Sequence, residues 1–386
     1  MSERLRRWRM ILGGQDADGT GTALSGVDAR RDAALEALYG KESDRRGGLG
    51  ASSPRVARWL GDIRGYFPSS VVQVMQRDAI DRLGLRELLL EPELLESVQP
   101  DVHLVGTLLS LNRAIPERSR ETARAVVRKV VDELEKRLAQ PTRQAVSGAL
   151  HRAGRTNRPR HGDIDWNRTI LANLRHYQPE QRTVVPERLV GFGRRLPSVS
   201  RRIVLCLDQS GSMAASVVYA SVFGAVLASI RSLRTQIIAF DTAVADLTEA
   251  MPDPVELLFG VQLGGGTDIN AALAYCQSRI DAPRETVLVL ISDLFEGGDE
   301  AAMRQRAQAL RADGVQVVCL LALSDDGAPA YDHDNAAALA ALGIPAFACT
   351  PDQFPDLLAA AIQQQDLVSW TAANDIPTAA PAEGGQ

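Results

Sequence analysis

One stretch of the chain limits its possible folds more than any other. Residues 203–207 form a short, uninterrupted apolar run, which is typical of a strand buried on both faces of a parallel sheet. The run is followed at once by Asp208-Gln209-Ser210-Gly211-Ser212 and then by a helical pattern. In open α/β sheets, ligands bind at the carboxyl ends of the strands. A carboxylate and two hydroxyls on one tight loop therefore predict a site for a hard cation such as Mg²⁺, Mn²⁺ or Ca²⁺.

Two later stretches add further oxygen ligands. Thr267 follows glycines 264–266 and precedes a helical pattern, and Asp293 ends a second buried apolar run at residues 287–291. The Asp-x-Ser-x-Ser loop alone would also fit an ordinary turn and helix cap. Together, however, the three stretches resemble the metal-ion-dependent adhesion site of von Willebrand factor A (VWA) domains, which has Asp-x-Ser-x-Ser, then Thr, then Asp in this order.

The resemblance implies a metal site and a mode of recognition. Mg²⁺ is the expected ion, with Mn²⁺ or Ca²⁺ as alternatives, and an open coordination position would accept a carboxylate from a partner protein. Asp268 is expected to cap the next helix or hold a metal-bound water, and Asp241 lies at the same sheet edge and could contact the ligands. The implied ligands are two carboxylates and three hydroxyls, from Asp208, Ser210, Ser212, Thr267 and Asp293.

Residues 201–366 alternate strand and helix patterns. This alternation predicts an α/β domain with a doubly wound, mostly parallel sheet, the Rossmann-like fold of VWA domains. Strands are expected at 203–207, 235–240, 286–291, 315–322 and 345–349, with a short edge strand at 243–247. The polar residues 324–334, which include Asp332-His333-Asp334, are expected to form a surface loop. Residues 367–386 are rich in Pro, Ala, Gly and Gln, and are predicted to be a disordered tail.

The preceding 200 residues divide into two parts. Residues 1–140 predict an α-helical domain, because apolar side chains recur at helical spacing, most clearly over residues 116–138. Residues 141–200 form an arginine-rich connecting region. Within it, a short helix is expected at residues 163–175. This helix, the arginines after it and the Asp-x-Ser-Gly-Ser-Met loop resemble the CoxE-like group of VWA proteins, which are typically paired with an AAA+ ATPase of the MoxR type.

Composition sets the broad class of protein. The chain has 386 residues, 45% hydrophobic and 24% charged, and a net charge of −5, which indicates a soluble protein of two domains with no overall preference for nucleic acid. The four cysteines are far apart in the sequence, so buried thiols in a reducing compartment are expected. No signal peptide or transmembrane segment is predicted, and a cytoplasmic location is expected.

Three functions compete on this sequence. The first is a non-enzymatic adaptor that uses Mg²⁺ to dock a partner, by resemblance a MoxR-type ATPase and its client. The second is an RNA-binding protein of the Ro type, suggested by the arginines, although the sparse aromatic residues make nucleic acid a weaker choice. The third is a metal-dependent hydrolase, which ranks last because no histidine is near the three loops to act as a general base. No phosphate-binding Gly-x-x-x-x-Gly-Lys-Ser/Thr loop is present, so no ATPase activity is expected.

Overall fold

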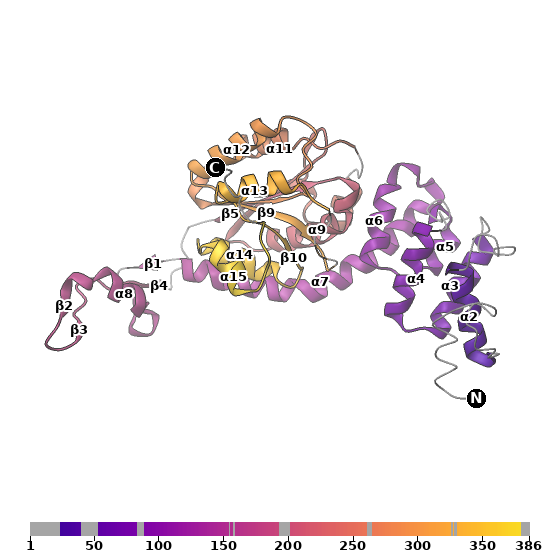
Figure 1. Ribbon diagram of the computed structural model, residues 1–386, viewed down its shortest axis with the longest axis horizontal. Helices are drawn as coiled ribbons and strands as arrows, with labels where there is room; N and C mark the ends of the chain where they lie inside the picture. The colour runs from indigo at the N-terminus through magenta and orange to yellow at the C-terminus, as the bar shows by residue number, and fades with distance from the viewer. Residues whose placement is uncertain are drawn as a thin grey trace, which may run out of the picture. The chain divides into compact units, whose positions relative to one another are not determined.

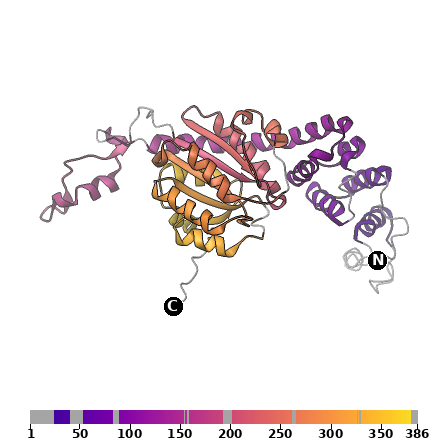
Figure 2. The same ribbon diagram turned by 90° about the horizontal axis from the view of Figure 1, so that it is seen from above.

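The computed structural model describes residues 24–39, 53–82, 89–153, 155–156, 159–192, 201–260, 265–325, 327 and 330–379. The chain divides into two compact units, Met1–Val130 and Val131–Gln386. The first is helical, and the second contains a six-stranded sheet (Figures 1 and 2).

The first unit is built from amphipathic helices, as the sequence predicts. Their apolar sides form its core, in which Leu38, Ile63 and Leu108 are fully buried. The indole nitrogen of Trp59 donates a hydrogen bond of 3.0 Å to the Ala34 carbonyl, which joins the first two helices. The helices are α2 (Gly26–Tyr39), α3 (Ser53–Tyr66), α4 (Ser69–Arg82), α5 (Pro92–Ser97), α6 (Val102–Ser110) and the first part of α7 (Glu117–Ala153).

Helix α7 is longer than the sequence predicts. It was expected to end near residue 138, before Pro141, but it continues through this proline to Ala153. A proline inside a helix removes one backbone hydrogen bond and costs about 3 kcal/mol. The helix continues because its apolar side remains buried beyond the proline, at Val146 and Ala149. The connecting region therefore starts about thirteen residues later than the predicted position.

The connecting region has more structure than its sequence suggests. Helix α8 (Trp166–Ala172) lies within the predicted helical stretch. The paired strands β1 (Arg155–Thr156) and β4 (Gly191–Phe192), and β2 (Tyr177–Gln178) and β3 (Thr183–Val184), were not predicted. Each strand is only two residues long, too short to show an alternating pattern.

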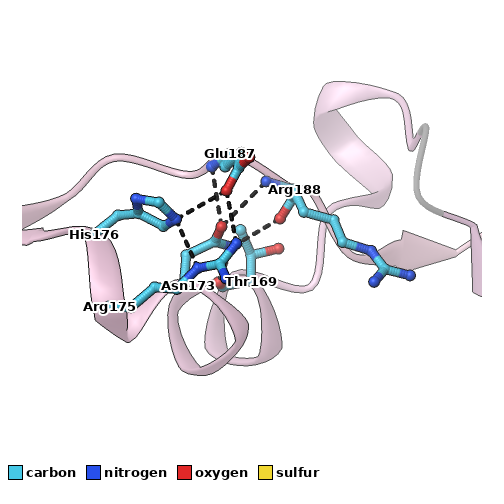
Figure 3. A network of polar contacts seen from close by, with 6 residues as sticks. All are labelled: Thr169, Asn173, Arg175, His176, Glu187 and Arg188. Carbon is cyan, nitrogen blue, oxygen red and sulfur yellow. Dashed lines mark hydrogen bonds and ion pairs between the residues drawn. The ribbon is translucent and has the colours of Figure 1, made fainter.

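Asn173, just after α8, is the centre of a polar network (Figure 3). Its amide nitrogen donates to the carbonyls of Thr169 and Arg188, at 2.6 and 2.8 Å. Its amide oxygen accepts from the backbone N–H groups of Glu187 and Arg188, at 3.0 and 3.1 Å. Because Asn173 is only 1% exposed, its buried side chain ties the end of α8 to the backbone of residues 187 and 188 by these four bonds.

Replacing Asn173 by alanine is expected to weaken the attachment of residues 187–190, which follow β3, to the end of α8. The substitution leaves the buried Thr169 carbonyl without this donor, at a cost of roughly 1–3 kcal/mol, and removes three bonds to the part-buried backbone of residues 187 and 188. Hydrogen exchange at the backbone amides of Glu187, Arg188 and Val190 would measure the effect. Asn167→Ala, an exposed asparagine at the start of α8, is the matched control, and equal protection in the two variants would contradict this role of Asn173.

The central sheet confirms the predicted fold class. Its strand order is β10-β9-β8-β5-β6-β7, and all neighbouring strands are parallel except β7, which pairs antiparallel with β6. The strands are β5 (Arg201–Asp208), β6 (Leu233–Phe240), β7 (Val244–Asp246), β8 (Thr286–Ile291), β9 (Gln316–Leu323) and β10 (Ala346–Cys349).

Helices cover both faces of this sheet (Figure 1). Alternate residues of β5 point to opposite faces, so Val204 and Cys206 belong to a core with α11 (Ile269–Arg279), α12 (Glu300–Ala312) and α13 (His333–Ala341). Leu205 faces α9 (Ala214–Ala228), where Gly224 lets the helix approach Ile237 closely. Helix α14 (Phe354–Ile362) also packs on α9, through Phe354 and Phe223. The short α10 (Pro254–Gly260) precedes α11. All four cysteines are buried, as expected.

Among the residues that the structure describes, one helical window is long and apolar enough to cross a membrane, contrary to the expectation from sequence. It is Gly211–Ala228, with a mean hydropathy of 1.7. In the structure 67% of this window is buried, and most residues of α9 are inaccessible to water. A helix enclosed on all sides is apolar all round, so its composition follows from its place in the core of the domain.

Part of the predicted disordered tail is ordered. Residues 367–373 form helix α15 (Leu367–Ala373), capped by Asp366. Further on, Thr378 forms a β-bridge with Phe347, and the Ala379 N–H donates to the Ala346 carbonyl at 2.9 Å. β10 is an edge strand with unpaired backbone groups. The tail is ordered there because it satisfies some of these groups, which composition alone does not predict.

Candidate metal centre

The candidate site lies where the winding of the sheet reverses. From β5 the chain moves to β6 on one side and later returns to β8 on the other, so the carboxyl ends of β5 and β8 border a topological switch point. Crevices at such points bind ligands in open α/β sheets. Asp208 is the last residue of β5, and Asp293 follows β8 after Ser292. Two of the predicted ligands therefore come from neighbouring strands of this crevice.

Asp208 is buried and held from two sides. Its Oδ1 accepts the Ser210 N–H at 2.9 Å, and its Oδ2 accepts the Ser292 hydroxyl at 2.7 Å. Burial raises the pKa of Asp208 and the nearby charge of Asp293 adds to this, whereas the two hydrogen bonds oppose it. A buried carboxylate is costly without a compensating charge, and a cation between Asp208 and Asp293 would supply that charge.

The two serine hydroxyls lie beside these carboxylates. The Ser210 and Ser212 Oγ atoms are 3.2 Å apart, and the Ser212 hydroxyl donates to Asp293 Oδ2 at 2.5 Å. Ser212 is exposed, whereas Asp208 and Asp293 are 1% and 4% exposed. The group is thus closed on the side of the sheet and open to solvent at the serines, where a ligand from another molecule could enter.

Thr267 is on the adjacent loop but is not joined to this group. Among the described hydrogen bonds, none connects its hydroxyl to Asp208, Ser210, Ser212 or Asp293. The loop itself is fixed nearby, because the N–H of Asp268 donates to the Asp241 carbonyl at 2.8 Å. The structure therefore brings four of the five predicted ligands into contact and places the fifth on a neighbouring loop.

The two remaining predicted residues organise this loop. Asp268 caps α11, accepting the Ala271 N–H at 2.7 Å. The carboxylate of Asp241 accepts the Ala243 N–H at 2.7 Å. Gly264 is outside the described residues. At Gly265, φ is +139°, and an added Cβ would lie 3.3 Å from Asp241 Oδ2, so the close approach of this loop favours glycine.

The loop after Asp293 holds the Thr267 loop in place, which the sequence analysis did not predict. The carboxylate of Glu296 accepts the Ile269 N–H at 2.7 Å and the Gly298 N–H at 3.0 Å. The N–H of Gly297 donates to the Thr267 carbonyl at 2.8 Å. Burial raises the pKa of Glu296, and the charge of Asp268 adds to this. Glu296 thus connects the loops that carry Asp293 and Thr267.

Two other features near the site differ from the expectation or were missed. Ser292, which holds Asp208, directly precedes Asp293 in the sequence, and this adjacency was the available signal.

The predicted surface loop at Asp332-His333-Asp334 is instead the start of α13, capped by Asp332. The Asp332 N–H donates to the Asp293 carbonyl at 2.9 Å, so the structure brings this segment beside the site. The His333 ring lies against Tyr331 at a centroid distance of 4.2 Å.

Replacing Glu296 by alanine is expected to weaken Mg²⁺ binding by about tenfold. Groups that orient metal ligands commonly contribute 10- to 100-fold to affinity, and this variant frees the backbone N–H of Ile269, two residues after Thr267. Isothermal titration with MgCl₂ would measure it. Glu300→Ala, in the exposed Arg304–Glu300 ion pair, is the control. Equal affinities in Glu296→Ala and the control would show that Glu296 does not position the ligands.

The available donors suit one class of metal. Within the described part of the chain, no group of three or more His, Cys, Asp or Glu side chains could hold a metal ion. A metal at this site would depend on hydroxyl and carboxylate oxygens together. Such oxygen donors fit Mg²⁺, Mn²⁺ or Ca²⁺ rather than soft metals.

Comparison with known proteins shows the family of the chain. Residues 134–358 match the family described as VWA domain containing CoxE-like protein. The chain belongs to this family. The uncharacterized protein YehP of Escherichia coli (strain K12) is 36% identical over 373 residues, which cover 94% of this chain and 97% of YehP. The CoxE-like match starts inside α7, consistent with the second half of this helix being part of the second unit.

Solved structures give a more distant likeness to this CoxE-like VWA protein. An aerotolerance-related membrane protein from Bacteroides fragilis NCTC 9343 is 14% identical, with a TM-score of 0.32, and covers 44% of the chain. BatB from Bacteroides thetaiotaomicron is 15% identical, with a TM-score of 0.33, and covers 45%. Each of these structures is matched over its whole length.

Proposed function

We propose that this protein is a non-enzymatic, Mg²⁺-dependent adaptor that works with a MoxR-type AAA+ ATPase in the assembly or remodelling of a client protein in the cytoplasm. The observation that supports it is the contact of Ser210, Ser212 and Asp293 above the buried Asp208, at the switch point of a CoxE-like VWA domain. When bound, Mg²⁺ supplies a coordination position for a carboxylate oxygen of a partner protein.

The chain's own residues prepare this recognition. Asp208 and Asp293 contribute negative charge that would attract the ion, and Ser210 and Ser212 contribute neutral oxygens. With few anionic ligands, a bound ion keeps positive charge for an incoming carboxylate. The exposed Ser212 and the half-buried Ser210 leave that side open to a partner. Asp332, next to His333, contacts Asp293 through its backbone amide, and the imidazole of His333 lies against Tyr331. This arrangement favours binding over hydrolysis.

The test is a reconstituted ATPase assay. The full chain is mixed with the MoxR-type ATPase of the same organism, and ATP hydrolysis is compared for the wild type and for Asp208→Ala. A variant replaces metal removal here, because the ATPase itself requires Mg²⁺ with ATP. The proposal predicts that the wild type changes the rate of ATP hydrolysis several-fold and that the variant does not. No effect of the wild type would overturn the adaptor role.

A further inference from the structure

The loop Asp293–Gly298, which begins at a residue of the candidate metal site, carries an exposed aromatic side chain, Phe295. Among the described residues of 201–379, the only large hydrophobic side chains that are exposed are Phe295, at 50%, and Val368, at 52%. Phe295 is two residues from Asp293. Apart from Val368, the other large apolar side chains described in this range are buried or half-buried, so Phe295 is an exception at this edge of the sheet.

The backbone before Phe295 adopts a costly conformation. Leu294 has φ of +65°, in the left-handed region, which costs a residue other than glycine about 1 kcal/mol. The Leu294 side chain is fully buried. Its N–H donates to the Ser292 hydroxyl at 3.0 Å, and its carbonyl accepts the Asn335 side-chain amide at 3.1 Å. This turn places Leu294 in the core and leaves the next side chain outside it.

The loop is fixed on its other side as well. Glu296 accepts hydrogen bonds from the backbone of Ile269 and Gly298, and the Gly297 N–H binds the Thr267 carbonyl. An added Cβ at Gly297 would lie 2.8 Å from that carbonyl oxygen. Phe295 is therefore presented by a rigid loop that also carries Asp293. Rigid aromatic side chains lose little conformational entropy on binding and are common at the centres of interfaces.

We propose that Phe295 is a specificity residue of the metal face, and that the partner segment carries an aliphatic or aromatic side chain next to the acidic residue that the metal accepts. This inference rests on the proposed function. A carboxylate alone occurs on every protein surface and would give little discrimination. An apolar neighbour that covers Phe295 removes apolar area from water and adds this gain to the carboxylate contact. The pair of contacts therefore selects a short acidic and apolar motif.

The test uses an array of immobilised 12-residue peptides. Each has one central Asp in a Ser/Gly background, and the residues on either side of the Asp are Ser, Leu or Phe. Retention of the full-length protein is measured in Mg²⁺ and in EDTA, for the wild type, Phe295→Ser, Phe295→Leu, Val368→Ser and Asp208→Ala. Because Phe295 and Val368 are half exposed, these substitutions leave the core intact, and Val368→Ser controls for loss of an exposed apolar side chain.

The inference predicts that Leu or Phe beside the Asp increases Mg²⁺-dependent retention by about fivefold, as expected for covering half of an aromatic side chain. The preference should disappear in Phe295→Ser and persist in Phe295→Leu and Val368→Ser. Equal retention of all Asp peptides by the wild type, or an unchanged preference in Phe295→Ser, would overturn the inference alone. If the wild type retained no Asp peptide in a Mg²⁺-dependent way, or Asp208→Ala retained them equally, the proposed function would fail with it.

Discussion

Asp208→Ala is expected to weaken Mg²⁺ binding by roughly a hundredfold, at the upper end of the effect of groups that hold metal ligands. The substitution removes one of the two carboxylates at the site. It also removes the acceptor for the Ser210 N–H and the Ser292 hydroxyl, so the serine loop is no longer held beside Asp293. Isothermal titration of the full chain with MgCl₂ measures the affinity. A value within threefold of the wild type would contradict a role for Asp208.

Two further variants separate metal binding from folding. Asp208→Asn preserves the shape of the side chain and removes a buried negative charge. Because burial raises the pKa of Asp208, ionised Asp208 destabilises the metal-free fold, and the asparagine variant is expected to be at least as stable in EDTA while binding Mg²⁺ poorly. Asp313→Ala removes a carboxylate at the end of α12, close to the amino end of β9, and should bind Mg²⁺ like the wild type.

Phe223→Ala is expected to lower the free energy of unfolding of the sheet-containing unit by about 3–5 kcal/mol. Phe223 lies in the middle of α9, and its ring packs against that of Phe354 in α14 at a centroid distance of 4.5 Å. Both side chains are fully buried, so alanine leaves a cavity between the two helices. Hydrogen exchange at the amides of β5 and β8, which open only on global unfolding, measures the loss.

The matched control is Phe295→Ala, which removes the same atoms from an exposed position. Its effect on stability should stay within about 0.5 kcal/mol. The comparison also tests the place of the apolar window Gly211–Ala228. A core helix predicts a large loss for Phe223→Ala, whereas a loss below about 1 kcal/mol would contradict the packing of α9 on the sheet and against Phe354 of α14.

The fold of the second unit could be predicted because its signals are local. The strands β5 and β8 contain continuous apolar runs, with Asp208 at the end of the first and Asp293 shortly after the second, and helical patterns separate the strands. A parallel sheet then follows from alternation, and the edge shared by Asp208 and Asp293 follows from the parallel order. The order of the strands and the direct contact of Ser212 with Asp293 required the structure.

The features that were missed depend on contacts between distant residues. Glu296 acts through the backbone of Ile269, and no sequence pattern around Glu296 indicates this role. Helix α7 passes Pro141 because of buried contacts that local propensity does not include. The network of Asn173 joins residues up to fifteen positions apart across strands of two residues. In each case tertiary packing outweighs the local pattern.

The central claim is that a divalent cation binds where the loops after β5, before α11 and after β8 meet. The most direct measurement is the anomalous diffraction of crystals of the full chain grown with Mn²⁺ as a heavier substitute for Mg²⁺. The account predicts an anomalous peak at the metal–oxygen distance of Mg²⁺ sites, ~2.1 Å, from the hydroxyl oxygens of Ser210 and Ser212, with the loop of Thr267 beside it. A peak at another place in the chain would contradict it. The absence of a peak at this site, at a Mn²⁺ concentration that supports full partner binding, would also contradict it.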